Sequence, residues 1–245
     1  MAAEHELAIT ALFNEYLAGP ANAILGVFGV KAEHPNHPWE NWLVMELLVV
    51  ALIMITVAIV RGRLSAENPG KLQQVFELIY EFIVKTIDDV GVHHGERFIY
   101  YVGTIFIFIL SMNLIGLIPG LDSPTNYPYV TVGLAIPTFL YYNVVGFREH
   151  GIGYLKQFMG PVAWLAPLMV PIELISHFVR PISLSVRLFG NMFAGEQVTG
   201  VFLSLTYVVI PVIFMLLHVF VAVVQTYVFT LLTTIYLGQA TSEEH

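Results

Sequence analysis

The chain has 245 residues, of which 57% are hydrophobic and only 11% are charged, and its mean hydropathy is +0.75. These values lie outside the usual range of soluble domains and predict an integral membrane protein. The lack of cysteine excludes disulfides, thiol catalysis and thiolate metal sites, and a net charge of −8 without any basic patch argues against nucleic-acid binding.

The first 40 residues are predicted to form a segment outside the membrane. Residues 5–18 place apolar side chains at mostly helical spacing, which predicts a short interfacial helix. Residues 41–63 then predict the first membrane helix, because an apolar run ends at two arginines. Residues 64–96 predict an amphipathic helix on the cytoplasmic side, with apolar side chains along one face and charges along the other.

Residues 97–150 predict a two-helix membrane hairpin, whose apolar spans are separated by a loop rich in proline. Residues 151–245 predict a long, tilted helix hairpin, because the apolar signal continues too far for a single helix. We expect its turn between 204 and 211. The predicted fold class is therefore an all-α integral membrane protein with about five membrane helices plus an amphipathic helix.

The basic residues predict the orientation of the chain. If the spans alternate, seven of them flank the same side, which is then cytoplasmic. They are Arg61, Arg63, Lys71, Lys85, Arg97, Arg148 and Lys156. The N-terminus is accordingly expected outside the cytoplasm and the C-terminus inside it.

Few charges interrupt the apolar C-terminal region, and Arg187 lies near its centre. A cation at membrane depth costs about 2.5–3.5 kcal/mol on insertion scales, so Arg187 is a candidate functional residue. At about 1.5 Å per residue, Glu173 lies about 21 Å from Arg187 toward the cytoplasm, and Glu196 about 14 Å from it toward the outside. These three charges are expected at three depths.

A polar stripe follows one face of this helix and indicates a cavity or a partner rather than lipid. Its members are Glu173, His177, Arg180, Ser183, Arg187 and Asn191. The next helix returns toward the cytoplasm, so we expect His218 to approach the depth of Glu196, and Gln225 that of Arg187.

Titratable side chains lie on both sides of Arg187 along the membrane, whereas Arg187 itself keeps its charge. Glu196 with His218 suits a water-linked proton path that opens outward, and Glu173 with His177 suits one that opens inward. Arg187 does not deprotonate in proteins, so it would block direct passage and attract a carboxylate. Two such half-paths conduct only when a mobile carboxylate carries the proton between them.

Four motifs, in order along roughly the last 150 residues, match a known family. They are MNLIGLIP at 112–119, PISLSVRLFGNMFAGE at 181–196, His218 with Gln225 seven residues later, and the ending from Ile235 to His245. These motifs resemble subunit a of the rotary F-type ATP synthase in its bacterial form.

The resemblance implies that Arg187 faces a ring of c subunits, whose membrane carboxylate is the mobile carrier. It places Glu173 on the proton exit side. It places Glu196, His218 and Gln225 in the path of proton uptake or at the junction of that path with the ring. The implied proton-translocation residues are Arg187, Glu196, His218, Gln225, Glu173 and Asn191. It further implies a non-catalytic, cofactor-free subunit of a bacterial inner membrane, with the c-subunit ring, the b-subunit peripheral stalk, the other ATP synthase subunits and lipid as partners.

Other interpretations follow when the residues are taken without the family. An arginine paired with a glutamate of another helix could hold a bundle together, and Asn113 and Ser183 are better explained by helix packing. An ion-coupled secondary transporter is the alternative function, although no internal repeat is found. A haem-bearing anchor would need two histidines at one depth, which His177 and His218 do not offer. The carried ion stays open between proton and sodium.

Overall fold

The computed structural model describes residues 7–27, 37–65, 67–92, 94–118, 120–154, 166–205 and 209–242. In this part of the chain every regular element is helical, and five helical segments are long and apolar enough to cross a membrane, which confirms the predicted fold class. The elements are α1 (Ala8–Val27), α2 (Asn41–Gly62), α3 (Lys71–Val90), η1 (Gly95–Phe98), α4 (Ile99–Ile115), η2 (Pro124–Asn126), α5 (Pro128–His150), α6 (Ala166–Leu205) and α7 (Val209–Thr241).

The N-terminal helix α1 is longer than the sequence predicted, because an apolar run continues the helix through Pro20 to Val27. Its side chain Asn14 accepts a hydrogen bond from the backbone N–H of Trp39 at 3.0 Å and donates one to the carbonyl of the same residue at 3.1 Å. The Trp39 indole N–H also donates to the carbonyl of Leu17 at 3.1 Å. These bonds fix α1 against the start of α2.

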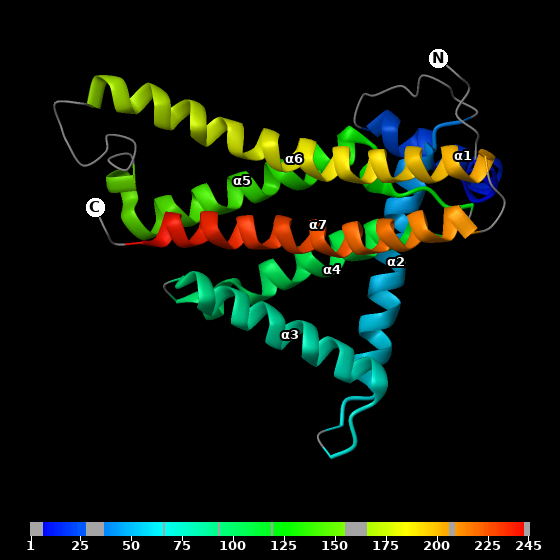
Figure 1. The fold of residues 1–245 in the computed structure, drawn as a ribbon, viewed down its shortest axis with the longest axis horizontal. Coiled ribbons are helices and arrows are strands. Elements are labelled where there is room, and N and C mark those ends of the chain that lie inside the picture. The colour runs from blue at the N-terminus through cyan, green and yellow to red at the C-terminus, as the bar shows by residue number, and fades with distance from the viewer. Residues whose placement is uncertain are drawn as a thin grey trace.

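The helices α2 and α3 diverge from the rest of the fold. In Figure 1 α2 runs vertically while α6 and α7 run horizontally, and α3 returns from the far end of α2 toward α4. Helix α3 buries Ile83, Thr86 and Ile87 and exposes its charged face, as its amphipathic pattern predicts. It ends at Gly91, whose φ of 73° is the left-handed conformation that glycine adopts without strain.

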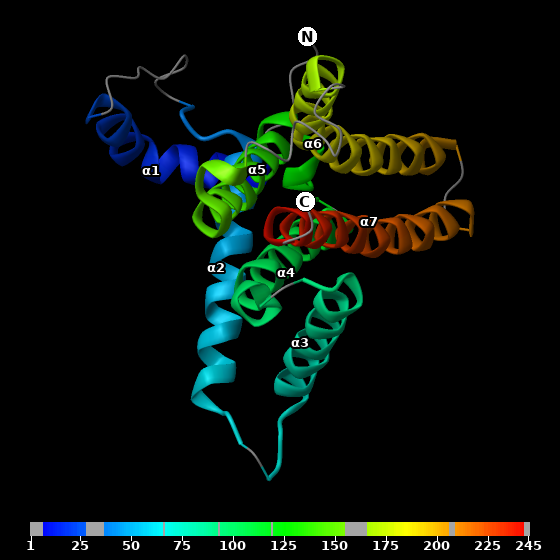
Figure 2. The same ribbon diagram turned by 90° about the vertical axis from the view of Figure 1, so that its left-hand side faces the viewer.

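The helices α6 and α7 form a long antiparallel hairpin and curve together (Figures 1 and 2). The 40 residues of α6 make a helix of about 60 Å, twice the thickness of a bilayer's hydrocarbon layer, so it must incline within a membrane. Pro171 and Pro181 lie inside α6 and each removes one backbone hydrogen bond, which favours bending. Helix α6 ends at Leu205 and α7 begins at Val209, in the region where the sequence predicts a turn.

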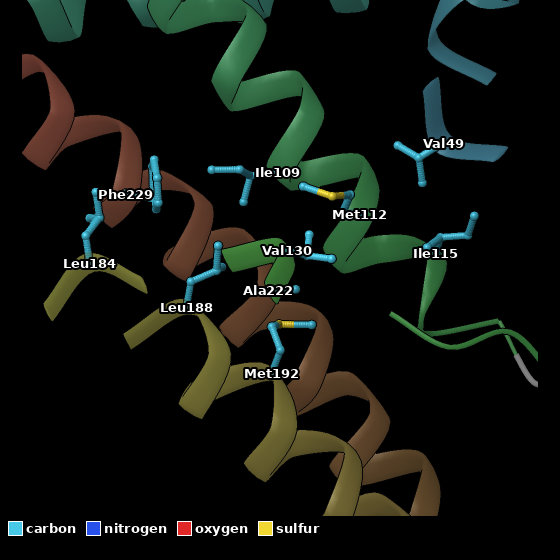
Figure 3. Packing of buried hydrophobic residues seen from close by; sticks show 10 residues of the cluster. All are labelled: Val49, Ile109, Met112, Ile115, Val130, Leu184, Leu188, Met192, Ala222 and Phe229. Carbon is cyan, nitrogen blue, oxygen red and sulfur yellow. The ribbon is translucent and has the colours of Figure 1, made fainter. Parts of the chain in front are cut away.

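A buried apolar cluster joins α2, α4, α5, α6 and α7 where they meet (Figure 3). Helix α6 contributes Leu184, Leu188 and Met192, which recur every four residues and so form one face. These side chains point toward Ala222 and Phe229 of α7 and toward α4 and α5 (Figure 3). Because this face of α6 packs in the core, the residues next to Leu184, Leu188 and Met192 in the sequence lie along the edges of the helix or on its outer face.

Candidate functional site

Arg187 lies on an exposed edge of α6, directly before the fully buried Leu188. Among the described residues no carboxylate forms an ion pair with it, so this part of the chain gives no support to a pairing between Arg187 and a glutamate. The side chains at Val186 of the same helix and Val223 of α7 are also exposed and apolar. A guanidinium presented from an apolar surface is costly in a membrane when it is unpaired, so Arg187 is a candidate functional residue in the structure as well.

One helical turn beyond Arg187, a hydrogen bond joins α6 to α7. The side-chain amide of Asn191 donates to Oε1 of Gln225 at 2.5 Å. Gln225 is 3% exposed, and its Nε2 has no hydrogen-bond partner within the described residues. The structure therefore brings Asn191 and Gln225 together near the level of Arg187, and leaves one buried donor of Gln225 without a partner among the described residues.

His218 lies one further turn along the same interface, against the backbone of Gly195. A Cβ atom added at Gly195 would lie 2.9 Å from both Cδ2 and Nε2 of the imidazole, so only glycine allows this approach. The ring is buried, and its Nε2 lacks a partner in the described part of the chain. Buried nitrogens on His218 and Gln225, seven residues apart on α7, are the kind of groups that ordered water satisfies.

Glu196 lines a cavity of about 390 Å³ between α6 and the loop that precedes α5, here called the Glu196 cavity. It is lined by Asp122, Asn126, Tyr127, Pro128, Tyr129, Phe189, Phe193, Glu196 and Gln197. Two carboxyl groups from distant parts of the chain, Asp122 and Glu196, thus face the same space. The sequence alone places Asp122 in the loop between two apolar spans, and nothing in it indicates that this loop lies against α6.

Burial raises the pKa of Asp122 above its ordinary value, because desolvation disfavours the charged carboxylate. A carboxyl group whose pKa is higher in the native than in the unfolded protein contributes to the stability of the fold only at low pH, where it is protonated. This advantage is present below the unfolded pKa of about 3.9 and is lost as the pH rises through the native pKa. At a pH above both pKa values, the ionised carboxylate of Asp122 destabilises the fold by the cost of its desolvation.

Replacing Asp122 by asparagine should therefore raise thermal stability at pH 8 and leave it unchanged near pH 4. We expect a gain of about 1–2 °C in the midpoint of thermal unfolding of the detergent-solubilised protein at pH 8. The control is Asp89→Asn on α3, because Asp89 is exposed and has little desolvation to relieve. A gain of equal size at both pH values, or in both variants, would contradict this explanation.

A buried polar network connects this loop to α7. The amide nitrogen of Asn113 donates to Oγ1 of Thr226 at 3.1 Å and to the carbonyl of Ala222 at 3.3 Å. Its Oδ1 accepts a hydrogen bond from Thr125 at 2.8 Å, and the Thr125 hydroxyl contacts that of Ser123 at 2.7 Å. Thr226 directly follows Gln225, so the network holds the loop beside the Gln225 segment, in keeping with the packing role expected for Asn113.

Glu173 lines a second cavity toward the other end of the hairpin, of about 30 Å³ and here called the Glu173 cavity. Its lining residues are Tyr154, Glu173, His177, Arg180, Tyr236, Gln239 and Ala240. This volume holds about one or two water molecules. The structure thus gathers Glu173, His177 and Arg180 in one place, well separated along α6 from Arg187.

The polar stripe predicted on α6 is divided in the structure. His177 turns inward, is 7% exposed, and its Nε2 lies 2.9 Å from Oδ1 of Asn143 on α5. Arg187 and Asn191 instead face the exposed edge, while Ser183 donates to the carbonyl of Arg180 within its own helix. The division follows from packing, because α5 covers the His177 side of α6.

The comparisons with known proteins all point to the same family. The sequence model of the family described as ATP synthase A chain matches residues 43–238. ATP synthase subunit a of Solibacter usitatus is 52% identical over 235 residues, which cover 96% of this chain and 100% of the relative. The corresponding protein of Koribacter versatilis is 46% identical over 242 residues, covering 98% and 99%, and that of a Sulfurihydrogenibium species is 41% identical over 207 residues, covering 84% and 100%.

Proposed function

Since the chain belongs to the ATP synthase A chain family, and is thus a proton-channel subunit of the F-type ATP synthase membrane sector, we propose that its α6–α7 hairpin forms two half-channels that meet at Arg187. The observation that carries this proposal is the position of Arg187. It is exposed on α6 between the Glu173 cavity and the Glu196 cavity, whose glutamates are about 35 Å apart along the helix.

Protons enter through the Glu196 cavity in this proposal. Asp122 and Glu196 line its wall, and both can accept and release a proton. Beyond it, the buried nitrogens of His218 and Gln225, which have no hydrogen-bond partner among the described residues, support a short chain of water molecules along the α6–α7 interface, as far as the turn next to Arg187. Protons leave on the other side through the Glu173 cavity, which is large enough for water.

Arg187 separates the two half-channels and faces the c-subunit ring. Its permanent charge repels a proton that passes directly, and it attracts the ring carboxylate in its ionised form. A carboxylate protonated from the Glu196 side is neutral and can enter lipid, so the ring turns before the proton is released near Glu173. One charge crossing 100 mV provides about 2.3 kcal/mol, so several protons must be collected through rotation for each ATP.

The remaining features of the proposal concern the surroundings of the subunit. It has no catalytic chemistry of its own and works with the c-subunit ring, the b-subunit peripheral stalk and the other ATP synthase subunits. Its membrane is the bacterial inner membrane, with the N-terminus outside the cytoplasm and the C-terminus inside. The distribution of basic residues supports this orientation, and it places the Glu196 cavity toward the outside and the Glu173 cavity toward the cytoplasm.

Single cysteines test both the half-channels and the orientation, because the natural chain has none. Gln197→Cys reports on the Glu196 cavity, and Gln239→Cys reports on the Glu173 cavity. A membrane-impermeant, water-soluble thiol reagent should label Gln197→Cys only from the extracytoplasmic side of sealed vesicles and Gln239→Cys only from the cytoplasmic side. The control is Ile182→Cys, an exposed apolar position on α6 outside both cavities, which should stay unlabelled from either side.

Labelling of both positions from the same side would contradict the two opposed half-channels. Labelling of Ile182→Cys at a similar rate would instead mean that the hairpin surface is generally wet, so that the cavities have no special access to water.

A further inference from the structure

A hydrogen bond between α5 and α6 lies next to Arg187 in the sequence and has no part in the mechanism described so far. The hydroxyl oxygens of Thr131 on α5 and Ser185 on α6 lie 3.0 Å apart. Both residues are buried, at 0% and 4% exposure, whereas Val186, which follows Ser185, is exposed. Hydrogen bonds of this kind hold helices together in membranes, where the hydrophobic effect does not.

The direction of this bond follows from the surroundings of Thr131. Its hydroxyl donates a hydrogen bond to the carbonyl of Pro128, in the first turn of α5, at 3.1 Å. A hydroxyl group has one proton, so the Ser185 hydroxyl donates to the oxygen of Thr131. Val130, beside Thr131, packs in the same buried cluster as Leu188 (Figure 3). Ser185 is thus bonded to a part of α5 that is itself fixed in the core.

A second hydrogen bond, between Asn191 and Gln225, holds the other flank of α6. At about 100° per residue, Asn191 lies about 40° around the helix from Arg187, and Ser185 lies about 160° around it in the same direction. Leu188, at about 100°, lies midway between them and faces the core. The two hydrogen bonds therefore bracket the buried face of α6, one toward α7 and one toward α5.

This pair of hydrogen bonds determines which way Arg187 points. Apolar side chains attract one another with little directional preference, so the core alone tolerates a small rotation of α6 about its axis. Rotation separates the bonded groups and leaves a buried hydroxyl or amide unpaired, which is costly. Arg187 lies on the side of the helix away from Ser185. The bond at Ser185 therefore fixes the direction of a guanidinium that it does not touch.

We infer that Ser185 and Thr131 are positioning residues for Arg187: their hydrogen bond fixes the rotation of α6 about its axis, so that the guanidinium stays between the two half-channels and faces the ring. The inference rests on the proposed function, in which Arg187 separates the half-channels. It assigns a role to two hydroxyl groups that line neither the Glu173 cavity nor the Glu196 cavity. Loss of the bond weakens the barrier without removing its charge.

The test is passive proton flux through the membrane sector of complete complexes after removal of the catalytic head, at equal levels of assembly. Thr131→Val keeps the shape of the side chain and removes the hydroxyl, whereas Thr131→Ser keeps the hydroxyl and removes a methyl group. We expect Thr131→Val and Ser185→Ala each to raise the flux by about threefold to tenfold, because one interhelical hydrogen bond in a membrane changes an equilibrium by about that factor. Thr131→Ser should stay close to the wild-type flux.

Three further variants separate positioning from a general loosening of the helices. In an Arg187→Ala background, Ser185→Ala should cause no further rise in flux, because no guanidinium is left to be placed. The double variant Thr131→Val with Ser185→Ala should leak no more than either single variant, since both changes remove the same bond. The matched control is Ser183→Ala, which removes a hydroxyl that donates to the carbonyl of Arg180 within α6, and it should leave the flux unchanged.

A wild-type flux in both Thr131→Val and Ser185→Ala, beside a raised flux in Arg187→Ala, would overturn the inference and leave the half-channels intact. So would a rise of similar size in Thr131→Ser or Ser183→Ala, or a further rise in the Arg187→Ala background. If Thr131→Val fails to assemble, Ser185→Ala decides the question, because it removes a single oxygen atom. Failure of the proposed function is read separately, from an unchanged flux in Arg187→Ala and from the cysteine labelling, and it would overturn this inference as well.

Discussion

Arg187→Ala is expected to abolish ATP-driven proton pumping by the complete complex, with a loss of about 100-fold or more, and to increase passive leakage through the membrane sector. The physical reason is the repulsion between a fixed guanidinium and a passing proton. Two unit charges 4 Å apart interact by about 4 kcal/mol at an effective dielectric constant of 20, which corresponds to roughly a 1000-fold barrier. Removing the exposed cation opens a direct route between the Glu196 side and the Glu173 side.

Pumping is measured with a pH-sensitive dye before the catalytic head is stripped off, and passive flux is measured afterwards at equal levels of assembly. Val186→Ala is the neighbouring control, because it shortens an exposed apolar side chain without changing the charge. Arg187→Lys tests the shape of the cation, since lysine lacks the planar fork of guanidinium. Unchanged flux with intact pumping in Arg187→Ala would mean that the charge only serves packing, and the proposed mechanism would have to be abandoned.

Gly195→Val is expected to reduce coupled proton pumping by about tenfold or more, even though it changes no charged or hydrogen-bonding side chain. The new Cβ would overlap the His218 ring at 2.9 Å, and the ring is buried against α6 with little room to move. Either His218 leaves its place or α6 separates from α7. Both outcomes disturb the α6–α7 interface next to Glu196 and weaken the Asn191–Gln225 hydrogen bond one turn away.

The matched control for this variant is Gly200→Val, on the same helix. No heavy atom lies within 4 Å of a Cβ added at Gly200, so valine can be accommodated there. ATP-driven pumping and the amount of assembled complex are compared for the two variants. Equal activity in both would show that the close approach of His218 to Gly195 is not needed for proton transfer. Equal loss in both would point to a general intolerance of α6 for valine.

The helical framework could be predicted well from the sequence, because length and hydrophobicity decide where a chain can cross a membrane. Arg187 was recognisable for the same reason, since a cation in an apolar run is rare and costly. Helical periodicity also placed His218 near the level of Glu196, and Gln225 near that of Arg187. The structure agrees through Gly195, adjacent to Glu196, and through Asn191, one turn from Arg187.

The residues that could not be predicted depend on contacts between distant segments. Asp122 belongs to the Glu196 cavity only because the loop before α5 lies against α6. The inward turn of His177 depends on Asn143, which is 34 residues away in the chain. The contact of Arg180 with the ring of Tyr236 likewise joins two different helices, α6 and α7. Periodicity within one helix contains no information about what covers each of its faces.

The inclination of the α6–α7 hairpin has a consequence for the direction of the motor. A helix of about 60 Å fits into a hydrocarbon layer of about 30 Å when its axis lies about 60° from the membrane normal. Most of the distance between Glu173 and Glu196 along α6 then lies in the plane of the membrane. In the proposed mechanism a proton that passes from one cavity to the other is therefore carried sideways as well as across the membrane, which requires a carrier that turns. In that mechanism the handedness of this inclination sets the direction in which the carrier turns, and reversal of the proton current reverses it.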